Sequence, residues 1–132
     1  MILLVDASAI VAIVRDEPEG AALISAVERA RVRLTNGIAL WEAARAVARG
    51  GTGRLEASLA EVERFCAAMT ITVAPIDASE AAEAVRAQRR YGKGTGHPAQ
   101  LNMGDCFAYA CAKTNNARLL YKGDDFTHTD LA

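Results

Sequence analysis

The sequence has little cysteine and no long hydrophobic run, and both shortages exclude classes of protein. Its cysteines, Cys66, Cys106 and Cys111, form an odd set without a Cys-x-x-Cys pair, so neither a disulfide framework nor a zinc knuckle is indicated. We expect them to be reduced, buried thiols. Charged residues interrupt every apolar run well before the roughly 20 residues that are needed to span a bilayer. No membrane partner is therefore expected.

Histidine and excess positive charge are also scarce. The two histidines, His97 and His128, are too few for a typical zinc site, and we expect them to be loop or surface residues. The formal net charge of −1 argues against nucleic-acid binding, because such proteins usually carry a basic surface. The average hides a local excess of positive charge in one short segment. Its basic residues are Arg86, Arg89, Arg90 and Lys93.

The length and the apolar content predict one globular domain over residues 1–132. A chain of 132 residues with 52% hydrophobic content can fill a single core without disulfides. The apolar run at the start resembles a secretory signal only superficially, because it stops at Asp6 and no basic segment precedes it. We therefore expect a cytoplasmic protein.

Short apolar runs alternate with segments of helical periodicity along the whole chain. The expected strands are Ile2–Val5, Val32–Thr35, Ile71–Val73 and Arg118–Tyr121. The expected helices are Ser8–Val14, Pro18 to about Arg31, Ile38–Arg49, Leu55–Met69, Ala78–Tyr91, and Gly104 to Asn115 or Asn116, with Ser8 and Asn36 as N-caps. This alternation predicts an α/β fold, a three-layer α/β/α domain with a mostly parallel central sheet.

Several acidic residues occupy positions where a carboxylate needs an explanation. Asp6 and Asp124 follow strand-like runs, so they should share the sheet edge at which parallel α/β proteins bind ligands. Glu42 has apolar neighbours, and Asp105 begins an otherwise apolar helix. Each acid taken singly has a plain structural explanation, as a helix cap, an ion pair with a nearby arginine or a favourable charge at a helix N-terminus.

A cation site explains these acids together. Clustered carboxylates repel one another unless positive charge neutralises them, and oxygen ligands suit Mg²⁺ or Mn²⁺. Such ions can activate a water molecule and stabilise the charge that develops on a phosphodiester. The acids therefore indicate a metal-dependent hydrolase of nucleic acid.

Four segments spread over the chain resemble the PIN-domain nucleases and, more closely, the VapC toxins of toxin-antitoxin systems. The segments are Val5-Asp6-Ala7-Ser8-Ala9, Leu40-Trp41-Glu42-Ala43, Leu101 to Ala110 (LNMGDCFAYA), and Leu119 to Phe126 (LLYKGDDF) with Thr129-Asp130. The last two are the most specific. The resemblance implies a PIN-like domain and a magnesium-dependent endoribonuclease that cleaves RNA with a metal-activated water.

The resemblance also implies roles for individual acids. Asp6, Glu42 and Asp105 would line the metal site, with Asp6 and Asp105 as the direct ligands. A fourth acid would come from Asp124 or Asp125. Similar proteins can have asparagine directly after the preceding glycine, which favours Asp125, whereas the strand-end geometry favours Asp124.

Further residues would support the site or bind its substrate. By the same resemblance, the hydroxyl of Ser8 would support the acids, and Asn102 would orient the loop before Asp105. The basic stretch Arg86 to Lys93, which includes Arg89 and Arg90, would hold the RNA backbone together with Lys122, since phosphate contacts position RNA without reading its sequence. A solvated helix face explains the basic stretch equally well.

The resemblance to VapC toxins implies two protein partners. One is a second copy of the chain in a homodimer, and the other is a cognate antitoxin that occludes the acidic cleft. Ile10, Ile13 and Leu23 exceed what a small core obviously needs, so we expect some of them to face a partner.

Two other classes of protein share parts of this pattern. A phosphatase of the haloacid dehalogenase type needs a second aspartate two residues after the first, where this chain has Ser8, and an acid where it has His128. A non-catalytic receiver-like module needs an acceptor aspartate after its middle strand, for which Asp77 is the only candidate. A receiver would leave Glu42 and Asp105 unexplained.

Overall fold

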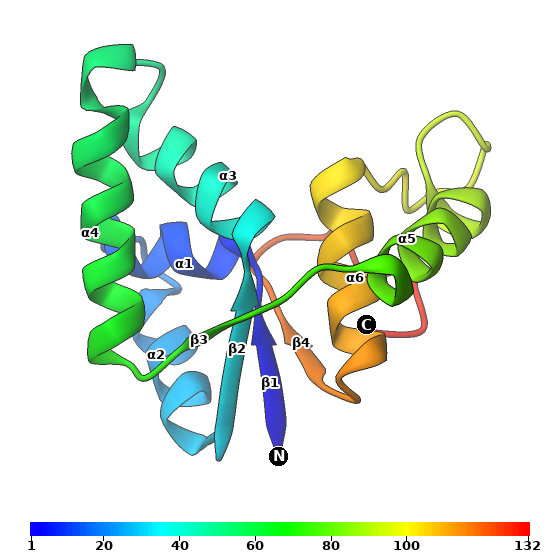
Figure 1. The fold of residues 1–132 in the computed structure, drawn as a ribbon, viewed down its shortest axis with the longest axis horizontal. Helices are drawn as coiled ribbons and strands as arrows, with labels where there is room; N and C mark the ends of the chain where they lie inside the picture. The colour runs from blue at the N-terminus through cyan, green and yellow to red at the C-terminus, as the bar shows by residue number, and fades with distance from the viewer.

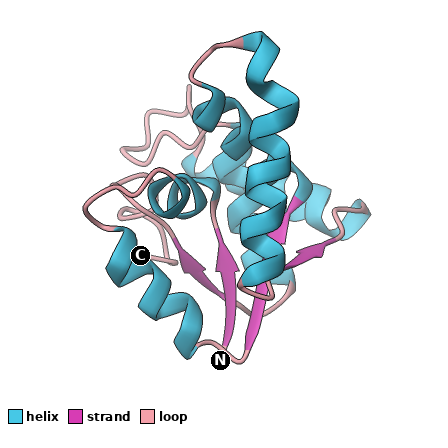
Figure 2. Ribbon diagram, turned by 90° about the vertical axis from the view of Figure 1, so that its left-hand side faces the viewer, coloured by secondary structure: helices cyan, strands magenta, loops and turns pink.

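A computed structural model describes residues 1–132 and places a parallel sheet between two groups of helices (Figures 1 and 2). The strands are β1 (Ile2–Val5), β2 (Val32–Asn36), β3 (Thr72–Ala74) and β4 (Arg118–Leu120), in the order β3-β2-β1-β4. The helices are α1 (Ala7–Val14), α2 (Gly20–Arg29), α3 (Gly37–Ala48), α4 (Leu55–Ala68), α5 (Ala78–Tyr91) and α6 (Met103–Thr114), with a short 3₁₀ turn, η1 (Thr52–Arg54), before α4. The predicted three-layer α/β/α fold is confirmed.

The central strand β1 supplies side chains to both faces of the sheet. It pairs in parallel with β2 on one side and with β4 on the other. Because successive side chains of a strand point to opposite faces, Leu3 and Val5 pack with α1 to α4, whereas Leu4 packs with α5 and α6. Burying a side chain such as Leu4, which is 1% exposed, stabilises the fold by about 1.5–3 kcal/mol.

The sequence placed most elements within a residue or two and misjudged some details. Helix α1 begins at Ala7 with Asp6 as its N-cap, so the expectation that Ser8 caps it was wrong. Asn36 caps α3 as predicted, because its side chain accepts a hydrogen bond from Ala39 N at 2.7 Å. Helix α2 begins at Gly20 and not at Pro18.

The apolar residues that we expected at a partner interface lie mainly in the core. Ile10 is fully buried, and Leu23 is 8% exposed. Ile13 is partly buried and packs against the same core cluster. These residues fill the space between α1, α2 and the sheet, and they provide no argument for a dimer. The three cysteines are buried and free, as predicted. No helix has the length and apolar character that crossing a membrane requires.

Candidate active site at the carboxyl edge of the sheet

The carboxyl ends of the strands point toward a gap between α3 and α6 (Figure 1). Asp6 follows β1 directly, and the segment after β4 carries Asp124 and Asp125. Glu42 lies on α3, and Asp105 lies in the first turn of α6. Four elements that are distant in sequence therefore bring acidic residues to one edge of the sheet.

Asp6 is a buried carboxylate held by its neighbour. Its Oδ2 atom accepts hydrogen bonds from the backbone N–H of Ser8 at 3.1 Å and from the Ser8 hydroxyl at 2.6 Å. Ser8 Oγ in turn accepts a hydrogen bond from the backbone N–H of Lys122 at 3.0 Å. Burial raises the pKa of Asp6 although the bonds from Ser8 oppose that rise, and the charge of Asp125 raises it further. Ser8 thus links β1 to the segment after β4.

Glu42 packs against the start of α6. A Cβ atom built on Gly104 would lie only 2.1 Å from Glu42 Oε1 and 2.4 Å from its Cδ, so the carboxylate sits where any side chain at position 104 would be. Desolvation raises the pKa of Glu42, the charges of Asp6 and Asp125 raise it as well, and Arg45 lowers it. The observed position of the Glu42 carboxylate therefore depends on a residue without a side chain at position 104.

Asp105 is oriented by a reciprocal pair of hydrogen bonds with Asn102. Its backbone N–H donates to Asn102 Oδ1 at 2.9 Å, and its Oδ2 accepts from the backbone N–H of Asn102 at 3.1 Å. Asp105 is 8% exposed. Desolvation, followed by the charges of Asp125, Asp6 and Glu42, raises its pKa to about 7, although the hydrogen bond from Asn102 opposes this.

The two candidates for the fourth acid differ in their electrostatic effect. The charge of Asp125 is one of the causes that raise the pKa values of Asp6, Glu42 and Asp105, and that of Asp124 is not among those causes. Strand β4 ends at Leu120, so a turn separates the strand end from the acidic pair. The electrostatics therefore favours Asp125 over Asp124.

The carboxylate oxygens of these acids are suitable ligands for a divalent metal ion, although they do not form a complete coordination shell. No three His, Cys, Asp or Glu side chains are close enough to enclose one ion. Desolvation is the largest cause of the raised pKa values of Glu42 and Asp105, and the charges of neighbouring carboxylates add to it because no counterion neutralises them. Magnesium retains several waters and needs only one or two carboxylates plus substrate phosphate. The oxygen-only donor set therefore fits a hydrated ion.

Two of the basic residues named from the sequence already have ion-pair partners. Lys122 Nζ forms ion pairs with Glu17 and, at 3.3 Å, with Glu19, so an RNA phosphate would have to compete for it. Three arginines of the basic stretch, Arg86, Arg89 and Arg90, line a groove of about 270 Å³ between α5 and α6, whereas Lys93 does not line it. Within it, Arg86 pairs with Glu83 at 3.2 Å.

Sequence reasoning missed two residues beside the acids. Trp41 is 55% exposed although the residues around it were expected to be buried, and the Arg45 guanidinium carbon lies 4.7 Å from the centre of its ring. The pair adjoins Glu42 along α3, and Arg45 acts on the Glu42 carboxyl group. The sequence feature that could have identified Trp41 is its position directly before Glu42.

The shifted carboxyl groups make the stability of the metal-free protein depend on pH. Asp105 has a pKa of about 7 in the folded state and an ordinary value of 3.8, so folding favours its protonated form. That stability is complete below pH 4 and is lost as the pH rises through 7. The shift corresponds to at most about 4 kcal/mol, and we expect about half because water still screens the group. Urea unfolding in chelator at pH 5 and pH 8 measures the loss, and a flat profile would contradict it.

The fold and the site define the class: a parallel α/β domain with interacting carboxylates at the carboxyl edge of its sheet. Residues 3–131 match the family model described as PIN domain. The chain belongs to the PIN domain family. The receiver-like alternative is not supported, because Asp77, its only candidate acceptor aspartate, is the N-cap of α5. The Asp77 side chain accepts a hydrogen bond from the backbone N–H of Ser79 at 3.2 Å. The phosphatase alternative has no support in the family assignment.

Curated relatives match over nearly the full chain. Ribonuclease VapC42 of Mycobacterium tuberculosis (strain ATCC 25618 / H37Rv) is 41% identical over 132 residues, which cover 98% of this chain and 96% of the relative. Ribonuclease VapC30 of the same strain is 38% identical over 131 residues, with coverage of 98% and 96%. Ribonuclease VapC of Mycolicibacterium smegmatis is 39% identical over 131 residues, with 98% coverage of both chains.

Proposed function

We propose that this protein is a VapC-type toxin, a metal-dependent endoribonuclease formed by one PIN domain over residues 1–132. The names of its relatives supply the reaction class, since they are called ribonucleases. The observation that carries the proposal is the convergence of acids from four elements on the carboxyl edge of the sheet, where desolvation first and neighbouring carboxylates second raise the pKa values of Asp6, Glu42 and Asp105. Acids in structural ion pairs have lowered pKa values, whereas no ion pair of the molecule includes these three residues.

The acids take different parts in this proposal. Asp6 and Asp105 would hold the metal directly, and Glu42 and Asp125 would complete the negative site around it. When bound, Mg²⁺, or Mn²⁺ in its place, supplies an activated water and charge stabilisation for the phosphodiester. Ser8 and Asn102 hold the two ligands in place through the hydrogen bonds described above.

Substrate and partners follow from the same proposal. Arg86, Arg89, Arg90 and Lys93 contact RNA phosphates without reading sequence, and Lys122 does so where it exchanges its ion pairs. The protein acts in the cytoplasm, forms a homodimer and is neutralised by a cognate antitoxin. Light scattering that gives a strict monomer at high concentration would reject the dimer. Failure to capture a protein encoded beside this chain's gene would count against the antitoxin.

One cleavage experiment tests the enzyme and the choice of the fourth acid. Purified protein should cut single-stranded RNA in Mg²⁺ or Mn²⁺ and not in chelator. Asp125→Asn should lower the rate by about 10- to 100-fold, because it removes one charge from the site, whereas Asp124→Asn is the matched control and should leave the rate unchanged. Cleavage that persists in chelator would reject the metal, and equal losses in both variants would reject the assignment to Asp125.

A further inference from the structure

Trp41 is the one large aromatic side chain that α3 exposes. The buried residues of α3 are all alanines, namely Ala39, Ala43, Ala44 and Ala48, so the helix packs closely with its small face. Trp41 instead leaves 55% of its surface open to solvent, and it is the only tryptophan in the chain. Exposing an indole forgoes the large apolar burial that this side chain could provide in a core. The exposed indole of Trp41 is therefore available to contact another molecule.

Arg45 covers one face of this ring and remains unpaired with any carboxylate. Its guanidinium carbon lies 4.7 Å from the ring centre, and the ion pairs of the molecule do not include it. Because Arg45 covers one face, a stacking partner would have to use the other face of the ring. The guanidinium retains planar hydrogen-bond donors for a phosphate or a base edge.

The pair borders the acid cluster. Trp41 precedes Glu42, whose carboxylate contacts Gly104 across the cleft, and Arg45 is close enough to lower the pKa of Glu42. On the other side of that contact, Met103 is 58% exposed and precedes Gly104. Exposed apolar side chains thus flank the place where α3 and α6 meet.

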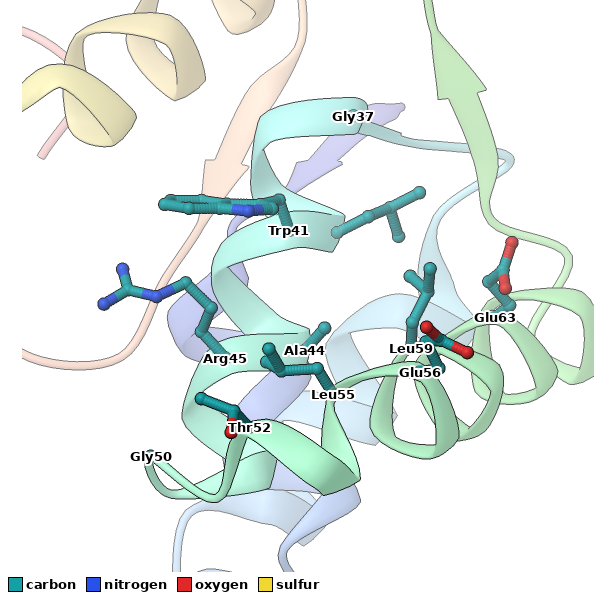
Figure 3. Close-up of a pocket in the computed structure, with 11 residues that line it drawn as sticks. Gly37, Trp41, Ala44, Arg45, Gly50, Thr52, Leu55, Glu56, Leu59 and Glu63 are labelled. Atoms are coloured by element: carbon teal, nitrogen blue, oxygen red, sulfur yellow. The ribbon is translucent and has the colours of Figure 1, made fainter.

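Trp41 also ends a groove of about 660 Å³ between α3 and α4 (Figure 3). In this view Trp41 and Arg45 project to one side of α3, whereas Glu56 and Glu63 lie on the opposite side, on α4. The acidic side of the groove would repel a phosphate backbone, and the side that carries Arg45 would attract one. Within this groove, charge therefore favours nucleic acid at the side of Trp41 and Arg45 over the side of α4.

We propose that Trp41 and Arg45 form a stacking platform that holds one unpaired base of the RNA substrate beside the acid cluster. The base stacks on the open face of Trp41, and Arg45 contacts the adjoining phosphate. This inference rests on the proposed ribonuclease function and adds to it a preference for single-stranded RNA, since a base can stack on a side chain only when it has left its own helix. Trp41 is thus a positioning and specificity residue.

The single tryptophan provides a direct readout of stacking. In chelator, a single-stranded RNA of about ten nucleotides should quench the fluorescence of Trp41 and protect it from acrylamide. An RNA of equal length without bases should bind through its phosphates and leave the fluorescence unchanged. A duplex should also leave it unchanged. Equal quenching by the RNA without bases, or none by the single strand, overturns the proposal.

Variants separate stacking from a general loss of apolar surface. Trp41→Ala should weaken binding of the single strand by roughly 10- to 100-fold, and Trp41→Phe should restore most of the affinity. Val73→Ala is the matched control, because Val73 is 48% exposed on the edge strand β3, which carries none of the residues assigned to RNA. Unchanged RNA affinity in Trp41→Ala overturns the platform. So does a defect in Trp41→Ala that is confined to binding of a protein partner.

The outcomes distinguish failure of this inference from failure of the proposed function. If the wild-type protein cleaves RNA in Mg²⁺ and Trp41→Ala cleaves single strands equally well, the platform is wrong and the ribonuclease stands. If fluorescence reports stacking but no RNA is cleaved with any divalent ion, the ribonuclease fails and the platform is supported as a binding site alone.

Discussion

Asp105→Asn should lower the rate of RNA cleavage by at least about three orders of magnitude, while the metal-free protein remains folded. Asparagine preserves the shape of the side chain and removes one of the two charges that we assign to direct metal ligation. Charge stabilisation by the bound ion is the main catalytic device of this site, so its loss should dominate the rate. Rates of cleavage of one RNA by both proteins in saturating Mg²⁺ measure the effect.

The same substitution should stabilise the protein in chelator. Asp105 is 8% exposed, and burial together with three neighbouring carboxylates raises its pKa to about 7. Above that pH the parent carries an unfavourable charge that the asparagine variant lacks. Thermal melts in chelator at pH 8 should therefore show the variant to be more stable than the parent. Magnesium should then stabilise the parent clearly and the variant little, because ligands stabilise by binding the folded state.

A purely structural role for Asp105 predicts the opposite pattern. If the carboxylate served only the capping pair with Asn102, asparagine would cost at most about 1 kcal/mol and leave the response to magnesium unchanged. Cleavage would also persist. The combination of higher stability in chelator with lost cleavage is therefore specific to a charged site.

The sequence predicted the fold because its apolar runs, its helical periodicity and their alternation all indicate the same α/β architecture. The apolar run Ile2–Val5 and the alternating helices specify a parallel sheet without help from long-range information. The same logic predicted that Asp6 would lie at the carboxyl edge, since a residue that follows a buried strand has no other place. Glu42 and Asp105 were candidates because of their apolar surroundings, but only the family resemblance assigned them to one site with Asp6, since no local pattern in α3 or α6 predicts that these helices meet.

The errors and the choices left open by the sequence arise where tertiary contacts determine the outcome. Asp124 and Asp125 are adjacent in sequence, and only the path of the turn after β4 determines which of them approaches the other acids. The sequence gives no sign that Lys122 is paired, because its partners Glu17 and Glu19 lie over a hundred positions away along the chain. Ile10 and Leu23 were expected at an interface because the depth of the core between α1, α2 and the sheet cannot be read from a pattern.

Gly104→Ala should lower RNA cleavage by about 100-fold without lowering stability. The added Cβ would lie 2.1 Å from Glu42 Oε1, and all three of its nearest atoms belong to the end of the Glu42 side chain. The carboxylate must therefore move, and a displacement of about 1 Å at a catalytic group can cost two orders of magnitude in rate. Alanine favours a helix over glycine by about 1 kcal/mol, so melts in chelator should show equal or higher stability.

Gly37→Ala is the matched control, because Gly37 also lies in the first turn of its helix and a Cβ there would meet nothing within 4 Å. It should keep full activity. If Gly104→Ala acts through Glu42, its effect must overlap with that of Glu42→Gln, since both disturb the same carboxylate. The double variant should then cleave about as slowly as the slower single variant. Losses that multiply would instead show that position 104 acts on the reaction by a route independent of Glu42, and the contact between α3 and α6 would lose its assigned part in the site.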